Sequence, residues 1–264
     1  MIRLFRNIRK KLAGKNKFIA YSRYAIGEII LVVIGILIAL QVNNWNENRK
    51  ENQVEIKYLS NLKHDLQKDS INLNKLMTIR FNKVSAAKKI LLYAQLNDVT
   101  NIFEIDSLYI DVAYWLEHVP NDNSCKELIS SGNLNIIKND TIKNLLLDLS
   151  NKNEEIVNDR NHMRREYEKY LYDKRTEVIN FFEINDASKN KISDDWFYPD
   201  KQTIDANTTS LRKDYLKLFE DNTFLTGLAY AAGNNLYLID QYHIMLAQIY
   251  SLIKLIDNEL KNNL

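Results

Sequence analysis

The residues best suited to chemistry in this sequence are histidines, two of which follow an aspartate with the spacing Asp-x-x-His. The two pairs are Asp159 with His162 and Asp240 with His243. On a helix, residues three apart share a face, and bundles that hold two metal ions use a related Glu-x-x-His spacing. Such sites also need a glutamate from each of two other helices, which the sequence does not place. We therefore interpret both as satisfied or exposed pairs and predict no metal site.

No other pattern of catalytic residues is present in the sequence. It lacks a phosphate-binding glycine loop, a Gly-x-Ser-x-Gly turn and a His-Glu-x-x-His helix. Its single cysteine, Cys125, cannot form an internal disulfide and has no metal-ligand spacing. We therefore predict that the protein is not an enzyme, and we expect neither catalytic residues nor a cofactor.

The stretch around which the chain is organised is apolar and lies at residues 24–43. Residues 29–40 contain no polar side chain, and the whole stretch is about as long as a helix that crosses roughly 30 Å of hydrocarbon. A buried core helix usually keeps one polar side, and a signal peptide needs a small-residue cleavage site after its apolar region. Neither feature is present, so we predict a transmembrane helix.

Two features inside this predicted helix are candidates for function. Glu28 is ionisable and lies about one turn from the start of the stretch, where its carboxylate either serves a function or reaches back to the lipid headgroups. A row of residues with a spacing of four would allow close approach of a second helix, unless these small residues are simply common in spans. The row consists of Gly27, Leu31, Gly35 and Ala39.

Charge predicts the orientation of the span. Residues 1–23 contain eight Lys and Arg residues and no acid. Residues 1–13 have apolar residues at helical spacing, which favours a basic amphipathic helix at the membrane surface over a disordered basic tail. The positive-inside rule then keeps residues 1–23 in the cytoplasm and exports residues 44–264. Since the net charge of the whole chain is +2, the rest carries about −6, which argues against nucleic acid as a partner.

Composition predicts an all-α fold. The chain has six Gly and two Pro in 264 residues, too few for the many turns of a sheet protein. Apolar periodicity predicts a helix over residues 46–95, one that continues the span or follows it closely, and further helices over 102–118 and 140–182. A short helix is expected to end at Ser131, with Gly132 in the left-handed conformation after it.

The last helix pair is expected to begin near Thr208. From Leu225 to Leu260 apolar residues alternate at steps of three and four, as in a helix of a bundle or coiled coil. Asn235 interrupts this apolar stripe. A polar residue at such a position fixes register, either within one chain or between two chains.

An irregular stretch over residues 184–205 contains an aromatic cluster. Trp196, Phe197 and Tyr198 follow one another in a polar surrounding. Aromatic residues in a loop can contact a partner, or they can fold back onto the bundle and cover its end. We keep both interpretations.

Two segments of the sequence are similar to a known family. The basic start followed by YAIGEIILVVIGILIALQVNNWNENRK, together with the segment ELISSGNLNIIKN, resembles a family of single-pass membrane proteins of Gram-negative bacteria whose function is unknown. This resemblance implies an inner-membrane anchor and a helical exported domain. It supplies no catalytic residues.

Together these observations predict a membrane-anchored helical bundle in the periplasm, attached to the inner membrane by one span. We expect it to act as an interaction or scaffolding module. Its expected partners are the lipid bilayer and either a second copy or another envelope protein. The alternative is a ligand-sensing domain. About 24 residues are too few for a cytoplasmic output domain, so a sensor would have to signal through a membrane partner.

Overall fold

A computed structural model describes residues 18–179 and 208–262, and these residues form helices and no strand. The all-α prediction is thus confirmed. The chain divides into two compact units, residues 1–57 and residues 58–264. The elements are α2 (Phe18–Leu96), α3 (Ile102–Ala113), α4 (Asn123–Ser130), the 3-10 turn η1 (Asn133–Ile136), α5 (Asp140–Glu166), the π-helical turn η2 (Tyr167–Tyr172), α6 (Asp173–Val178), α9 (Thr208–Glu220) and α10 (Asn222–Asn262).

In the first unit, α2 carries the apolar stretch as one uninterrupted helix. Its side chains are exposed on every side, from 47 % for Val33 to 70 % for Leu31. The helix is long and apolar enough to cross a membrane, although a signal sequence near an N-terminus has the same properties. The predicted amphipathic segment over residues 1–13 lies outside the described residues.

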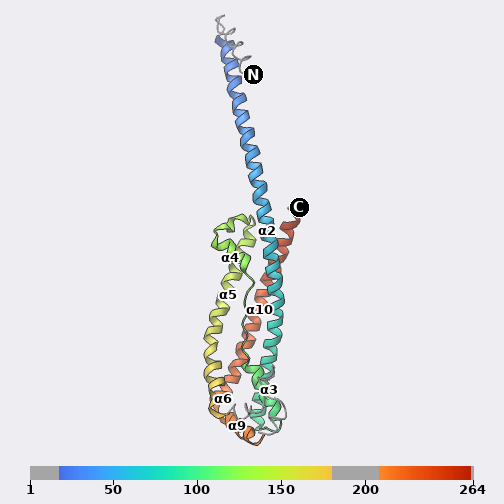
Figure 1. Cartoon of the computed structure of the whole chain (residues 1–264), viewed down its shortest axis with the longest axis vertical. Coiled ribbons are helices and arrows are strands. Elements are labelled where there is room, and N and C mark those ends of the chain that lie inside the picture. The colour runs from blue at the N-terminus through green and yellow to red at the C-terminus, as the bar shows by residue number, and fades with distance from the viewer. Residues whose placement is uncertain (1–17, 180–207, 263–264) are drawn as a thin grey trace, which may run out of the picture. The chain divides into compact units, whose positions relative to one another are not determined.

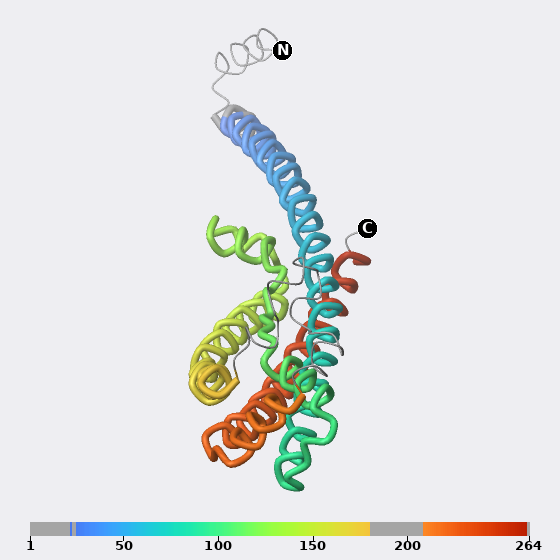
Figure 2. Tube along the Cα trace, turned by 60° about the horizontal axis from the view of Figure 1, so that its bottom comes forward, coloured from blue at the N-terminus to red at the C-terminus, as the bar shows by residue number. Residues whose placement is uncertain are grey.

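The second unit is a bundle of three long helices, namely the part of α2 from Tyr58 onwards, α5 and α10 (Figures 1 and 2). The direction of α10 follows from its contacts with α2. Lys63 pairs with Asp257 near one end, and Arg80 bonds to Asn235 further along, so the two helices are antiparallel. Contacts between α5 and α10 follow the same order. Asn139, just before α5, bonds to Glu259, and Tyr167 just after it bonds to Asn235. Hence α2 and α5 run in the same direction.

The apolar stripes predicted for these helices form the core. Leu59, Leu62 and Leu73 of α2 are at most 2 % exposed, and the central positions of the α10 heptad are also buried. Each helix buries only one side, since the residues between the stripe positions are exposed. The second unit therefore has the core of a water-soluble bundle.

The connection from α3 to α4 departs from the prediction. A helix was expected over residues 102–118, but α3 ends at Ala113 and residues 114–122 are not helical. We call residues 114–122 the strap. Because α2 and α5 run in the same direction, the chain must return along the bundle before α5 can begin. Contacts of Val112 with Lys83 and of Ser124 with Asp65 show that this segment follows α2 backwards.

The distance that the strap covers explains its extended form. The contacted positions of α2, 65 and 83, are about 27 Å apart along the helix, at 1.5 Å per residue. The returning segment between residues 112 and 124 would span only about 18 Å as a continuous helix. Extended residues are therefore required, and the apolar periodicity of residues 114–118 reflects packing rather than helix formation.

Helix α5 begins where the sequence predicted, and the helical path that it starts ends earlier than predicted. Asn139 caps α5 by accepting hydrogen bonds from the backbone N–H groups of Thr141 and Ile142. The helical path continues through η2 and α6 and ends at Val178, four residues before the predicted end at residue 182. The next residue, Ile179, adopts an extended conformation. Gly132 has a φ of 70° after the short helix α4, as predicted.

At one end of the bundle α3, α6 and α9 meet around a buried ion pair. Arg175 of α6 donates to Asp106 Oδ1 over 2.6 Å, and Tyr215 of α9 donates to the same oxygen over 2.6 Å. The Arg175 guanidinium also lies over the ring of Tyr109, 4.5 Å from its centroid. Asp106 and Tyr215 are fully buried, so this cluster joins three helices through one carboxylate.

Candidate functional site

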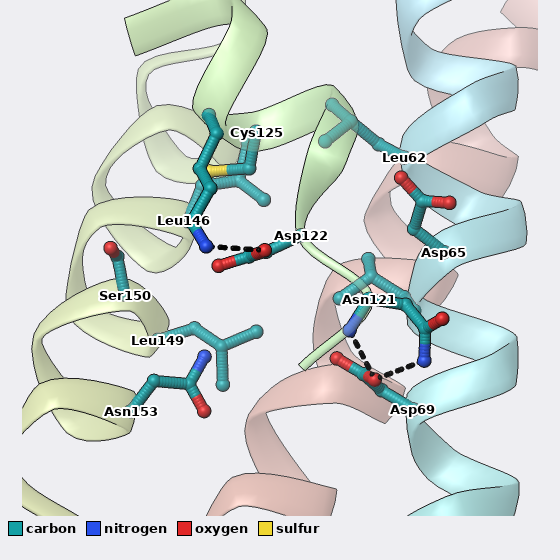
Figure 3. A pocket seen from close by; sticks show the side chains of 12 residues that line it. Leu62, Asp65, Asp69, Asn121, Asp122, Cys125, Leu146, Leu149, Ser150 and Asn153 are labelled. Carbon is teal, nitrogen blue, oxygen red and sulfur yellow. Dashed lines mark hydrogen bonds and ion pairs between the residues drawn. The ribbon is translucent and has the colours of Figure 1, made fainter. Parts of the chain in front are cut away.

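The strap is fastened to α2 by polar side chains that the helix buries. Lys83 donates to the carbonyl oxygens of Val112 and Tyr114, and Arg80 donates to that of Leu116. Nearer the N-terminal end of α2, Asp69 accepts hydrogen bonds from both the backbone N–H and the side-chain amide of Asn121, at 2.7 and 2.8 Å (Figure 3). Asp65 accepts from the backbone N–H and the hydroxyl of Ser124 at the start of α4.

These buried polar residues have a structural cause. A non-helical segment inside a bundle exposes backbone donors and acceptors that helix formation would have paired. Leaving one such group buried and unpaired costs about 1–3 kcal/mol. Asp69, Arg80 and Lys83, each at most 6 % exposed, supply the missing partners. Their role is thus to hold the strap, which a sequence pattern alone could not reveal.

Arg80 also organises the polar centre of the bundle. Its guanidinium donates to Asn235 Oδ1 over 2.8 Å and to the Tyr242 hydroxyl over 3.0 Å. Asn235 in turn donates to the hydroxyl of Tyr167 and to the carbonyl of Ala231. Asn235 is 1 % exposed, so it fixes the register of α10 within the chain. Of the two roles that the sequence left open for Asn235, the structure supports the first.

The surroundings of Lys83 disfavour the protonated form of its side chain. Burial lowers the pKa of Lys83 to about 7, and the nearby Arg80 guanidinium acts in the same direction. Its ammonium group also lies 5.5 Å from the centroid of the Tyr167 ring, a cation–π distance. The side chain is therefore a buried hydrogen-bond donor that is only partly protonated near neutral pH.

A cleft of about 450 Å³ opens between the strap and α5. Its size falls within the range of small-molecule sites. His118, Pro120, Asp122 and Lys126 line one side, and the α5 residues Ser150, Asn153, Glu154, Ile156, Val157 and Asn158 line the other. A smaller pocket adjoins it and shares Asp122, Lys126, Ser150 and Asn153. In Figure 3, Ser150 and Asn153 of α5 lie across this pocket from Asp65 and Asp69 of α2.

The most unusual group in the cleft is the imidazole of His118. The residue is 7 % exposed, and a side-chain hydrogen bond with the neighbouring Asn153 favours the protonated form of its ring. Burial lowers the pKa of His118 below its usual value, so the ring is neutral near pH 7. Its other side packs on the ring of Tyr242, with 6.0 Å between centroids.

Other groups in this region are poorly suited to catalysis. Burial raises the pKa of Cys125 to about 11, so its thiol stays protonated and is a weak nucleophile at neutral pH. Among the described residues there is no group of three or more His, Cys, Asp or Glu side chains arranged to hold a metal ion. His162 and His243 are exposed, and Asp159 accepts a hydrogen bond from Tyr237.

The predicted membrane features all lie on α2. Gly27 and Gly35 have open space where a side chain would begin, and Leu31 and Ala39 are exposed. Glu28 is partly exposed on the same helix. The aromatic cluster of Trp196, Phe197 and Tyr198 lies outside the described residues.

Comparison with known proteins gives one match. The model of a family of unknown function, DUF6090, matches residues 28–197, which is more than half of the chain. The match includes most of the apolar stretch, the strap and α5. No curated protein and no solved structure matches the chain.

Proposed function

We propose that this chain, which belongs to the DUF6090 family, is a single-pass membrane protein whose helical bundle acts as a non-enzymatic interaction or scaffolding module. One observation carries the proposal. The apolar residues 29–40 of α2 are exposed on every side, whereas the bundle buries its apolar side chains on one side of each helix. Exposed apolar surface of this extent is stable in lipid and unstable in water.

The basic N-terminal segment supports the orientation in this proposal. Residues 1–23 carry eight positive charges without an acid, which favours a cytoplasmic N-terminus. The bundle then lies on the outer side of the inner membrane, in the periplasm. The partners are the bilayer itself and either a second copy or another envelope protein.

Reporter fusions test the orientation. An enzyme that is active only outside the cytoplasm, fused after Leu264, should be active, and a reporter that fluoresces only in the cytoplasm should be dark at the same place. In the same cells, alkaline extraction should leave the full-length chain in the membrane fraction. The opposite reporter pattern would exclude this orientation. A shortened, soluble product would show that the apolar helix is a cleaved signal sequence.

Ligand sensing is the second candidate function. The observation that favours it is the cleft of about 450 Å³ beside the strap, whose lining includes the buried His118 and polar side chains of α5. A sensor of this kind would pass its signal to a protein in the membrane. If the purified protein binds no small molecule in this cleft, ligand sensing is excluded and the interaction role remains.

A further inference from the structure

We propose that a small cavity bounded by the strap, α2, α5 and α10 binds one halide ion, with Arg80, Lys83 and Arg160 as the residues that hold it. We call it the basic cavity, and it shares no lining residue with the cleft beside the strap. The proposal adds an inorganic ligand to the interaction role. It does not depend on the orientation of the protein in the membrane, so anion binding and topology can fail separately.

The first argument is the charge of two buried residues, Arg80 and Lys83. They lie three residues apart on one face of α2, and each is at most 6 % exposed. Charged groups inside proteins normally face an opposite charge. The acceptors of these two residues among the described residues are all neutral, namely the side chains of Asn235 and Tyr242 and the backbone carbonyls of Val112, Tyr114 and Leu116. Neutral donors could hold the same carbonyls, so fastening the strap does not account for two cations.

The second argument is that acids do not compensate these two charges. None of the described residues that line the basic cavity is acidic. Asp111 favours the charge of Lys83 but is itself exposed, so water weakens its effect. Glu117 Oε2 lies 3.1 Å from a guanidinium nitrogen of Arg160 and compensates that residue instead. Arg80 and Lys83 therefore produce a positive potential at the cavity, which attracts an anion.

The third argument is a buried donor in the cavity lining. Arg160 Nε is buried and has no hydrogen-bond partner among the described residues. Buried donors nearly always have a partner, and an exception calls for one. The hydroxyl of Tyr167, which also lines the cavity, accepts a hydrogen bond from Asn235, so its own hydrogen is available to a further acceptor. A spherical anion can accept hydrogen bonds from several directions at once.

The fourth argument is the size of the cavity. Its volume is about 20 Å³, and one water molecule needs about 10–15 Å³ of such space. Sulfate, phosphate and carboxylates contain several heavy atoms and are too large for this volume. A water molecule fits but brings no negative charge. The ligand class is therefore a monatomic anion, and chloride is the probe that tests it.

Chloride binding is measured on the full-length protein in phosphatidylcholine nanodiscs. Sodium chloride is titrated against sodium gluconate at constant ionic strength, and the line width of the ³⁵Cl NMR signal reports exchange with a protein site. We expect a Kd on the order of 10–100 mM, because a single atom gains little binding energy. Sodium sulfate should not displace the bound chloride. A line width equal to that of empty nanodiscs would overturn the proposal, and displacement by sulfate would overturn the monatomic ligand class.

Variants locate the site. Arg160→Met and Lys83→Met keep an unbranched side chain but remove the charge and its donors, so each should weaken chloride binding about fivefold or more. The matched controls are Arg164→Met and Lys88→Met, which change the same residue types at exposed positions of the same helices outside the cavity lining. Both controls should leave chloride binding unchanged.

A variant that should strengthen binding completes the test. Glu117→Gln removes the acid that compensates Arg160 while keeping an acceptor for Trp115 Nε1, so chloride should bind about threefold more tightly. Circular dichroism checks that every variant is folded. If Lys83→Met does not fold, Arg160→Met and Glu117→Gln decide the outcome. Chloride binding that these two variants leave unchanged, or that Arg164→Met weakens as much as Arg160→Met, would overturn the site.

Discussion

Two regions of one helix use apolar residues in opposite ways. In residues 29–40 of α2 every position is apolar or glycine, and all of these residues are exposed. From Tyr58 onwards the apolar residues recur every three or four positions, and the stripe is buried. The difference lies in the pattern, since both regions contain leucine. A stripe suits a helix between protein and water, and an unbroken run suits a helix surrounded by lipid.

The two regions also differ in how they hold polar groups. The bundle buries Asp69, Asp106, Arg80, Lys83 and Asn235, and hydrogen bonds or ion pairs hold each of them. The apolar stretch has one ionisable residue, Glu28, near its start. Polar residues in the bundle therefore determine its internal architecture.

The largest expected effect comes from breaking the buried ion pair. Asp106→Ala should lower the free energy of unfolding of the bundle by about 3–5 kcal/mol, because it leaves the Arg175 charge buried without its partner. Tyr215 loses its acceptor as well. Urea unfolding followed by circular dichroism measures the change.

Asp214→Ala is the matched control, because Asp214 pairs with the exposed Lys217 on the surface of α9. Its effect should stay below about 1 kcal/mol. If the two substitutions cost the same, the buried cluster would not be an anchor for α3, α6 and α9.

The next largest effect compares two leucines of α2 directly. Leu62→Ala should destabilise the bundle by about 2–5 kcal/mol, because Leu62 is 2 % exposed in the core. Leu37→Ala should leave bundle unfolding unchanged, because Leu37 is 58 % exposed within the apolar stretch. The same urea assay on both variants in nanodiscs gives the result. Similar losses in the two variants would erase the distinction between the two regions.

Much of this architecture could be predicted because it depends on local patterns. The apolar run, the stripe of α2, the left-handed Gly132 and the heptad of α10 are all properties of neighbouring residues. The long helices and their buried sides followed from these patterns. The fold class was therefore accessible without coordinates.

The strap and the cleft could not be predicted, because they depend on contacts between distant residues. The apolar periodicity of residues 102–118 predicted one continuous helix, but α2 and α5 run in the same direction, which requires an extended return after Ala113. The partners of Arg80 lie 36 to 162 residues away in the sequence. Only a clue was available, namely that charged residues occur at positions close to the apolar stripe of α2.

A smaller effect should appear in the pH dependence of stability. The pKa of His118 is lowered in the folded bundle, so the unfolded chain binds more protons below about pH 6.5 and stability falls as the pH decreases. The wild type should lose stability between about pH 7.5 and 5.5, and His118→Phe should lose less. Urea midpoints at several pH values measure this.

Lys83 changes the stability in the same direction as His118, but over a different pH range. With a folded pKa of about 7, its contribution changes mainly above neutral pH and levels off below it. The difference between wild type and His118→Phe therefore isolates the histidine. Parallel pH profiles of the two proteins would mean that the His118 ring is solvated in the folded state.

The smallest expected effect on folding belongs to the apolar helix. Gly35→Leu should change the unfolding free energy of the bundle by less than about 0.5 kcal/mol, since a side chain at Gly35 meets no atom of the chain within 4 Å. It should nevertheless reduce association between copies, because Gly35 and Ala39 lie one turn apart and their small size permits close backbone contact in lipid. Quantitative cross-linking in native membranes compares the two proteins, with Leu37→Ala as the control in the same helix. Equal cross-linking in wild type and Gly35→Leu, or none in either, would remove the helix as an association surface. The apolar stretch would then serve only as an anchor, and contacts with a second copy or another partner would have to come from the bundle.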